Sequence, residues 1–98
     1  MNQFLIDLLK CLCLELDGAT DTQIAKKLNV PRRTVAEWRL GTKRMEGKTA
    51  RLIAEILGRD PDLLELEVAV ACAPDERLKD TYSRLLEQKR YLAEKKLV

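Results

Sequence analysis

Histidine is absent from the sequence, and glycine occurs only four times. Without histidine the chain lacks the side chain that most often serves as a general acid or base near neutral pH. The few glycines form no glycine-rich phosphate loop, and no serine or cysteine has a base beside it that would activate a nucleophile. The sequence therefore predicts a protein that is not an enzyme, needs no cofactor and has no evident small-molecule ligand.

Long apolar runs are also missing. None approaches the roughly 20 residues that span a bilayer. The first 16 residues are biased toward apolar side chains, but Asp7, Lys10 and Glu15 interrupt them and no small-residue cleavage site follows. We therefore expect no secretory signal, no membrane contact and a location in the cytoplasm.

Cysteine is scarce, with three residues in the chain. Cys11 and Cys13 are two residues apart, so on a helix they point about 200° away from each other and do not chelate one metal ion together. With Cys72 the count is odd. We expect no metal site, and we expect these cysteines to be buried and reduced.

Positive charge is concentrated in the middle of the chain. The net charge is only +2, yet residues 26–51 carry nine lysines or arginines against two acids, and the segments on either side are net negative. A basic segment between acidic ends indicates a surface that faces phosphates. A merely solvated face is the alternative explanation.

The same region predicts two short helices that meet at a tight corner, with the sequence TDTQIAKKLNVPRRTVAEWRLG over residues 20–41. Thr20 and Gln23 have the spacing of a capping box, so the first helix begins directly after Thr20. Asn29 falls where the chain must turn, because asparagine tolerates a positive φ. Pro31 then suits the first turn of a second helix.

The second helix, over residues 31–40, has one apolar side and one charged side. At about 100° per residue, Val35 and Trp38 lie together, and the charged residues lie opposite them. Guanidinium groups match the two acceptors of guanine, a small apolar residue can meet the thymine methyl, and a carboxylate can accept from cytosine. The residues expected to read bases in this way are Arg32, Arg33, Ala36 and Glu37.

This pattern resembles the helix-turn-helix of the lambda-repressor-like Cro/CI superfamily. The residues that carry the resemblance are Ala25, the turn at Asn29-Val30, Val35, Trp38 and Gly41, followed by a basic run. Residues 4–86 are similar to small phage-encoded regulators of this type, including ones associated with filamentous phages. The resemblance implies an all-α fold: a compact helix-turn-helix domain of about five helices plus a long C-terminal helix, in which the third helix reads the major groove.

By position, the resemblance also implies DNA-phosphate contacts at Thr34, Thr42, Lys43 and Arg44, and we expect such contacts at Thr22 and Arg39 as well. Such residues orient a protein on the duplex without reading its sequence, because phosphates look alike at every step. The chain departs from the family at three positions. Asp21 stands where a glutamine that touches phosphate is frequent, Asn29 replaces the commoner glycine, and Met45 stands where proline is frequent.

Three further helices are expected before residue 74. An apolar stripe predicts the first over about residues 2–16, and glycine follows as a stop signal. Another spans roughly residues 47–57. A third begins after Asp60, a good N-cap, with Pro61 as its first residue, and is apolar nearly all round, so it must be covered on more than one side.

Pro74 is expected to open a final helix, which divides the chain into a DNA-binding domain at residues 1–73 and a dimerisation or packing element at residues 74–98. Leucine recurs in that helix every seven residues. The pattern indicates either a short coiled-coil seam between two subunits or a helix folded over the preceding one. We favour a role in dimerisation, and the expected interface residues are Leu66, Val70, Leu78, Tyr82 and Leu85.

These features predict a sequence-specific, double-stranded DNA-binding transcriptional regulator of the phage or prophage repressor kind. A homodimer would insert two copies of helix 31–40 into major grooves about one helical turn apart. The alternative is a protein-binding module, such as an antirepressor, antitoxin or adaptor, that uses the fifth helix and the last helix.

Overall fold

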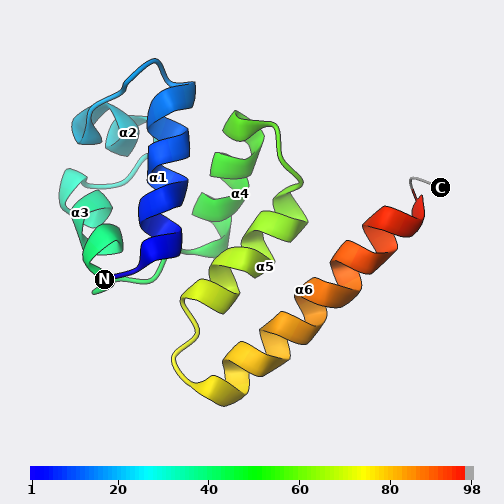
Figure 1. Cartoon of the computed structure of the whole chain (residues 1–98). Helices are drawn as coiled ribbons and strands as arrows, with labels where there is room; N and C mark the ends of the chain where they lie inside the picture. Colours follow the sequence, from blue (N-terminus) through cyan, green and yellow to red (C-terminus); the bar gives the residue numbers. More distant parts are fainter. Residues whose placement is uncertain (97–98) are drawn as a thin grey trace.

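Six helices follow one another in the computed structural model, which describes residues 1–96 (Figure 1). They are α1 (Gln3–Glu15), α2 (Asp21–Leu28), α3 (Arg32–Leu40), α4 (Gly47–Leu57), α5 (Pro61–Ala71) and α6 (Glu76–Lys96). No strand occurs in this part of the chain, and the predicted all-α fold of five helices plus a long C-terminal helix is confirmed. The final helix was expected to reach residue 98, and its last two positions lie outside the described residues.

The core lies around α1, which runs between the α2–α3 pair and the α4–α5 pair (Figure 1). Leu5, Leu9 and Leu12 of α1 are fully buried, as the apolar stripe predicts. They pack in one cluster with buried residues from α2 to α5. Because burial of apolar surface supplies most of the stabilisation, this helix holds the α2–α3 pair in place.

Local signals set the boundaries of the helix pair. The Thr20 side chain accepts from the backbone N–H of Gln23, and the Gln23 side chain accepts in return, which completes the predicted capping box. Asn29 ends α2 at a φ of 57°, and Gly41 ends α3 at a φ of 77°. Both residue types adopt this left-handed conformation at low cost, and the two predictions are confirmed.

The start of α6 differs from the prediction. Pro74 was expected to open this helix, but α6 begins at Glu76. The Asp75 side chain accepts from the backbone N–H of Leu78 at 2.8 Å, so Asp75 serves as the N-cap and Pro74 lies in the preceding turn. Capping by aspartate outweighs the preference of proline for a first helical turn.

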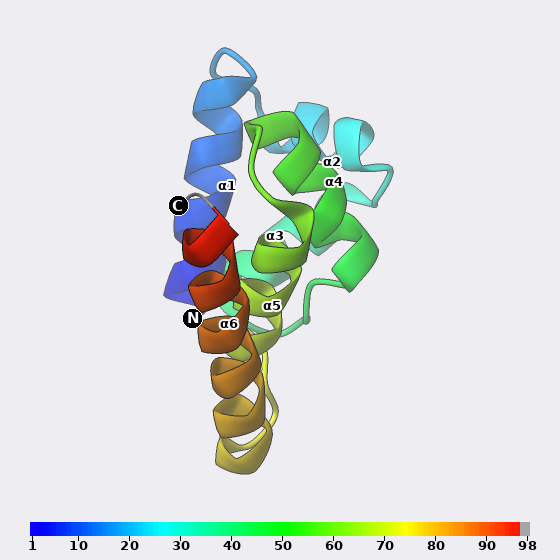
Figure 2. The same ribbon diagram turned by 90° about the vertical axis from the view of Figure 1, so that its right-hand side faces the viewer.

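α6 folds back over α5 of the same chain (Figures 1 and 2). Leu86 is buried, and two ion pairs flank it: Arg90 with Glu67 at 3.0 Å and Lys89 with Asp62 at 3.4 Å. Lys89, which interrupts the leucine pattern, thus pairs with an acid of α5. Within residues 1–96 no helix combines the length and the apolar character needed to cross a membrane.

Candidate nucleic-acid interface

α3 buries one side and exposes the other. Val35 is fully buried and Trp38 is 2% exposed, while Arg32, Arg33 and Ala36 are exposed. The burial of Val35 and Trp38 therefore turns the other three outward, as the helical period predicts.

Arg33 and Glu37 lie one turn apart on the outward side of α3. The Arg33 Nε and the Glu37 Oε1 are 3.9 Å apart, and the Arg33 side chain is 88% exposed. A pair of this kind on a helix surface contributes only a few tenths of a kcal/mol, so it does not restrain either group strongly. Both side chains remain able to turn toward a ligand.

Arg39 is held by an acid instead of projecting freely. Its guanidinium donates to the carboxylate of Asp21, and both side chains are about one-third exposed. The hydrogen bond from Arg39, with a smaller contribution from the charge of Arg32, lowers the pKa of Asp21 below its usual value. The pair joins the start of α2 to the last turn of α3. Sequence reasoning missed this pair, and the only signal for it was the acid at a position where glutamine is frequent.

Substitution of Asp21 by asparagine is expected to make stability less dependent on pH in acid. A carboxylate whose pKa is lower in the folded state stabilises the fold fully above about pH 4, and this contribution is lost as the pH falls through the folded-state pKa. The loss stays below about 1 kcal/mol, because the pair is partly screened by solvent. Urea unfolding at pH 7 and at pH 3 measures it. A difference between wild type and Asp21→Asn that is the same at both pH values would contradict the assignment.

Thr34 is nearly buried, unlike the other residues expected to contact phosphates. The residue is 5% exposed, and its backbone N–H donates to the Pro31 carbonyl at 3.0 Å. Thr34 directly precedes the buried Val35, so its burial does not favour a phosphate contact, which stays a prediction for this side chain. Thr22, in the first turn of α2, is exposed.

The loop after α3 carries the other expected phosphate ligands. Thr42, Lys43 and Arg44 are all exposed, and the Thr42 hydroxyl donates to the Glu37 carbonyl at 3.4 Å. This bond ties the loop to the outward side of α3. Lys43 and Arg44 therefore place two cations just beyond the C-terminal end of α3.

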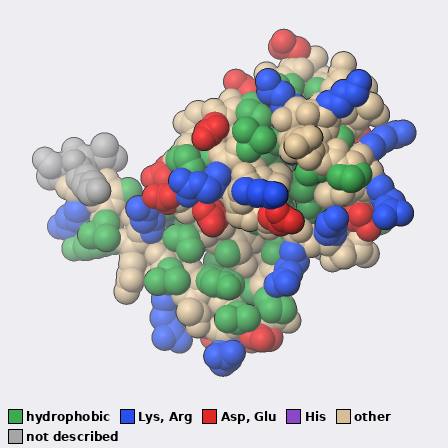
Figure 3. All heavy atoms as spheres, turned by 180° about the vertical axis from the view of Figure 1, so that it is seen from behind, with side chains coloured by type: hydrophobic (Ala, Val, Ile, Leu, Met, Phe, Trp, Pro, Cys, Tyr) green, Lys and Arg blue, Asp and Glu red, His purple; other side chains and the backbone are tan. Residues whose placement is uncertain are grey.

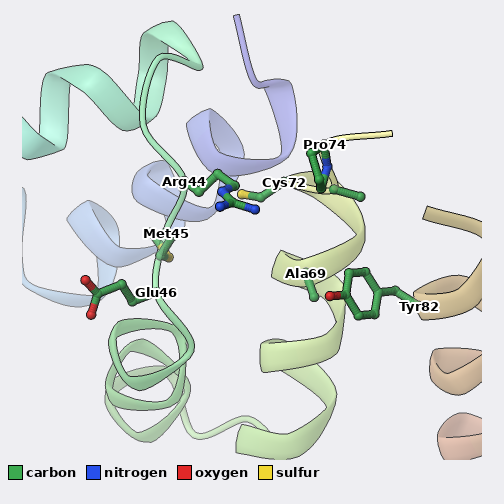
Figure 4. A pocket seen from close by; sticks show the side chains of 8 residues that line it. Arg44, Met45, Glu46, Ala69, Cys72, Pro74 and Tyr82 are labelled. Carbon is green, nitrogen blue, oxygen red and sulfur yellow. The ribbon is translucent and has the colours of Figure 1, made fainter. Parts of the chain in front are cut away.

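Arg44 also lines a hollow of about 270 Å³ between this loop and the α5–α6 hairpin (Figure 4). Tyr82 of α6 reaches toward Ala69 of α5 on the opposite side of it. The hollow thus places a cation of the loop close to the C-terminal hairpin.

The residues expected at a dimer interface all belong to that hairpin. Leu66, Val70, Leu78 and Tyr82 are half-buried, and Leu85 is 46% exposed. Seen from behind, hydrophobic side chains gather on the lower half of the molecule, where the hairpin lies (Figure 3). The hairpin therefore presents an incompletely covered apolar surface.

The cysteines are less buried than expected. Cys11 is exposed, so the prediction of burial is wrong for it, whereas Cys13 and Cys72 are half-buried. The Cys13 thiol donates to the Ala19 carbonyl at 3.3 Å. Across residues 1–96 no three acids or cysteines gather in a way that would hold a metal ion.

Comparison with known families matches the region just described. The family model HTH_3, described as helix-turn-helix, matches residues 14–64, which is just over half of the chain. The match begins in the last turn of α1 and ends in α5, so it includes the whole of α2, α3 and α4. No curated protein and no solved structure matches the chain.

Proposed function

This chain belongs to the helix-turn-helix family of DNA-binding regulators, and on that premise we propose that it binds specific sequences of double-stranded DNA through α3. The observation that carries the proposal is the division of α3 into a side anchored by Val35 and Trp38 and a side that exposes two arginines. A helix of this diameter fits the major groove, where base edges differ from one another.

The outward side of α3 has the chemistry for base recognition. Arg32 and Arg33 can donate in pairs to O6 and N7 of guanine, Ala36 can contact a thymine methyl group, and Glu37 can accept from the amino group of cytosine. The weak ion pair between Arg33 and Glu37 leaves both groups available in the free protein. We therefore assign base reading to these four residues.

Phosphate contacts are assigned to a smaller set than the sequence suggests. Lys43 and Arg44 supply charge from the loop, and Thr22 and Thr42 supply hydroxyl groups from exposed positions. Arg39 is engaged by Asp21 in the free protein, so its main role is to fix α3 against α2. The phosphate contacts of Lys43 and Arg44 provide affinity that falls steeply with added salt.

Replacement of Lys43 by alanine is expected to weaken binding to the specific target sequence, called the operator below, and to duplexes of random sequence by the same factor. The loss of one phosphate contact reduces the slope of log affinity against log salt concentration by about 1. Fluorescence anisotropy over a salt series measures both quantities. Lys10→Ala, which removes an exposed lysine from α1, is the matched control and should leave the slope unchanged. A change confined to one DNA sequence would argue against a phosphate role for Lys43.

We also propose that the protein acts as a homodimer through the α5–α6 hairpin. Leu85 and Leu92 of α6 are 46% and 57% exposed, and a second copy could cover them together with the half-buried Leu66 and Val70. Two copies of α3 would then meet half-sites about one helical turn apart. The more specific role of a phage or prophage repressor rests on the resemblance of the sequence alone, and it stays a prediction.

The same exposed leucines favour a second candidate, a protein-binding module of the antirepressor, antitoxin or adaptor type. Its binding surface would be α5 and α6 instead of α3. Purified protein that fails to shift any duplex at low salt, and that instead forms a defined complex with one protein, would favour this function over the first.

A further inference from the structure

Three parts of the chain that are far apart in sequence meet at Asn2. Its side-chain Oδ1 accepts from the backbone N–H of Leu5 at 3.1 Å and caps α1. Its Nδ2 donates to the carbonyl of Ala71, the last residue of α5, at 3.1 Å. Its backbone N–H donates to the carbonyl of Arg39, in the last turn of α3, at 3.3 Å.

The two backbone carbonyls that accept hydrogen bonds from Asn2 occupy equivalent places in their helices. Both lie in the last turn of a helix, where carbonyl groups have no partner within the helix. Asn2 is half-buried, so these groups gain partners without relying on solvent. One residue thereby connects the end of the recognition helix to the end of α5.

The start of the chain also lies closely along the end of α3 (Figure 1). A Cβ atom at Gly41 would stand 3.4 Å from the Asn2 nitrogen and 3.5 Å from the backbone of Met1. Gly41 has a φ of 77°, so a larger residue would be strained there as well. The close approach keeps the Asn2 backbone within reach of the α3 carbonyl.

From these contacts we infer that Asn2 is a positioning residue for sequence recognition: it fixes the C-terminal end of α3 relative to α5. The inference rests on the proposed function and goes beyond it, because Asn2 is assigned no contact with DNA. It acts through Arg39 on the helix that carries Arg33 and Glu37.

Base reading is more sensitive to such positioning than phosphate binding is. A side chain that pairs with a base edge needs its partner held to within about 0.5 Å. Long cationic side chains reach phosphates over a range of positions, and phosphates repeat along the duplex. Loss of the Asn2 side-chain contacts should therefore reduce the preference for operator over random DNA and leave affinity for random DNA unchanged.

Asn2→Ser is the sharpest variant. Serine still caps α1, but its hydroxyl is too short to replace the side-chain bond to Ala71 as well. Asn2→Asp is the second variant: aspartate keeps the cap and the shape, loses the donor and adds one negative charge, which lowers affinity for operator and random DNA alike, so the ratio of the two affinities is the readout. Each should lower operator affinity by up to about five- to tenfold, because one lost hydrogen bond reduces the population of correctly placed α3 by at most about that factor. Thermal unfolding followed by circular dichroism identifies a temperature at which every variant is fully folded, and the DNA affinities are measured at that temperature.

Asp60→Ala is the matched control. Asp60 caps α5 through the backbone N–H groups of Asp62 and Leu63, so the substitution removes a cap without touching Asn2 or α3. The ratio of operator to random affinity should be unchanged in Asp60→Ala and reduced in both Asn2 variants. An unchanged ratio in the folded Asn2 variants overturns the inference while the proposed function stands. Wild-type protein that binds no duplex overturns both.

Discussion

Truncation of Trp38 to alanine is expected to lower the free energy of unfolding by about 3 to 5 kcal/mol. Trp38 is 2% exposed and is the largest fully buried side chain on the inner side of α3. A small domain has a free energy of unfolding of only about 5 to 15 kcal/mol. A large fraction of the variant molecules should therefore unfold on mild heating. Urea denaturation followed by circular dichroism measures the loss.

Trp38→Phe separates packing from hydrogen bonding. The indole Nε1 of Trp38 is buried and has no hydrogen-bond partner within the part of the chain that the structure describes. Phenylalanine keeps an aromatic ring and loses no hydrogen bond, so its cost should be much smaller than that of alanine. If neither substitution destabilised the protein, Trp38 would not anchor α3; if both did so equally, the whole indole ring would be needed for the packing and a smaller aromatic ring would not replace it.

The second large effect is expected at Arg33. Arg33→Ala should lose about 1 to 3 kcal/mol of operator binding and relax the base preference at one position of the site. The reason is that a paired donation to guanine has no substitute once the guanidinium is removed. Affinities for the operator and for its variants at each base pair measure both effects.

Arg33→Lys is the matched variant for this prediction. Lysine keeps the positive charge and loses the planar fork, so random-sequence affinity should be retained while operator preference falls. Equal losses on operator and random DNA in Arg33→Ala, with full recovery in Arg33→Lys, would mean that Arg33 supplies charge alone.

The parts of the fold that follow local rules were predictable from the sequence. The capping box at Thr20, the turn at Asn29 and the start of α5 after Asp60 each depend on residues within four positions of one another. The exposure of Arg32 and Arg33 followed from the helical period, because Val35 and Trp38 had to face the core. Local chemistry therefore predicted these helix ends and the outward side of α3, whereas the arrangement of the helices was implied by the resemblance to the helix-turn-helix family.

What could not be predicted depends on contacts between distant residues. Arg39 and Asp21 are 18 positions apart, and no spacing rule links a residue of one helix to a partner in another. The hydrogen bonds from Asn2 to the carbonyls of Ala71 and Arg39 likewise join residues that are far apart in the sequence. Thr34 lies at the edge of the buried side of α3, where a period of 100° per residue does not decide between inside and outside.

The side of α6 that packs against α5 was also not predictable from the sequence. The leucine repeat at Leu78, Leu85 and Leu92 indicated one side of the helix as the contact surface, but the contact with α5 includes the buried Leu86 and the ion pairs of Lys89 and Arg90, and Leu85 and Leu92 stay exposed. The sequence gives the period of an amphipathic helix but not the neighbour that covers each side. The exposed leucines consequently remain available for the proposed dimer.

Selection of bound sequences from a random duplex pool is the most direct test of the claim that α3 reads bases. The account predicts that the pool converges on an inverted repeat whose half-sites are about one helical turn apart. A pool that the protein retains without enriching any sequence would contradict it, since α3 would then bind DNA by charge alone.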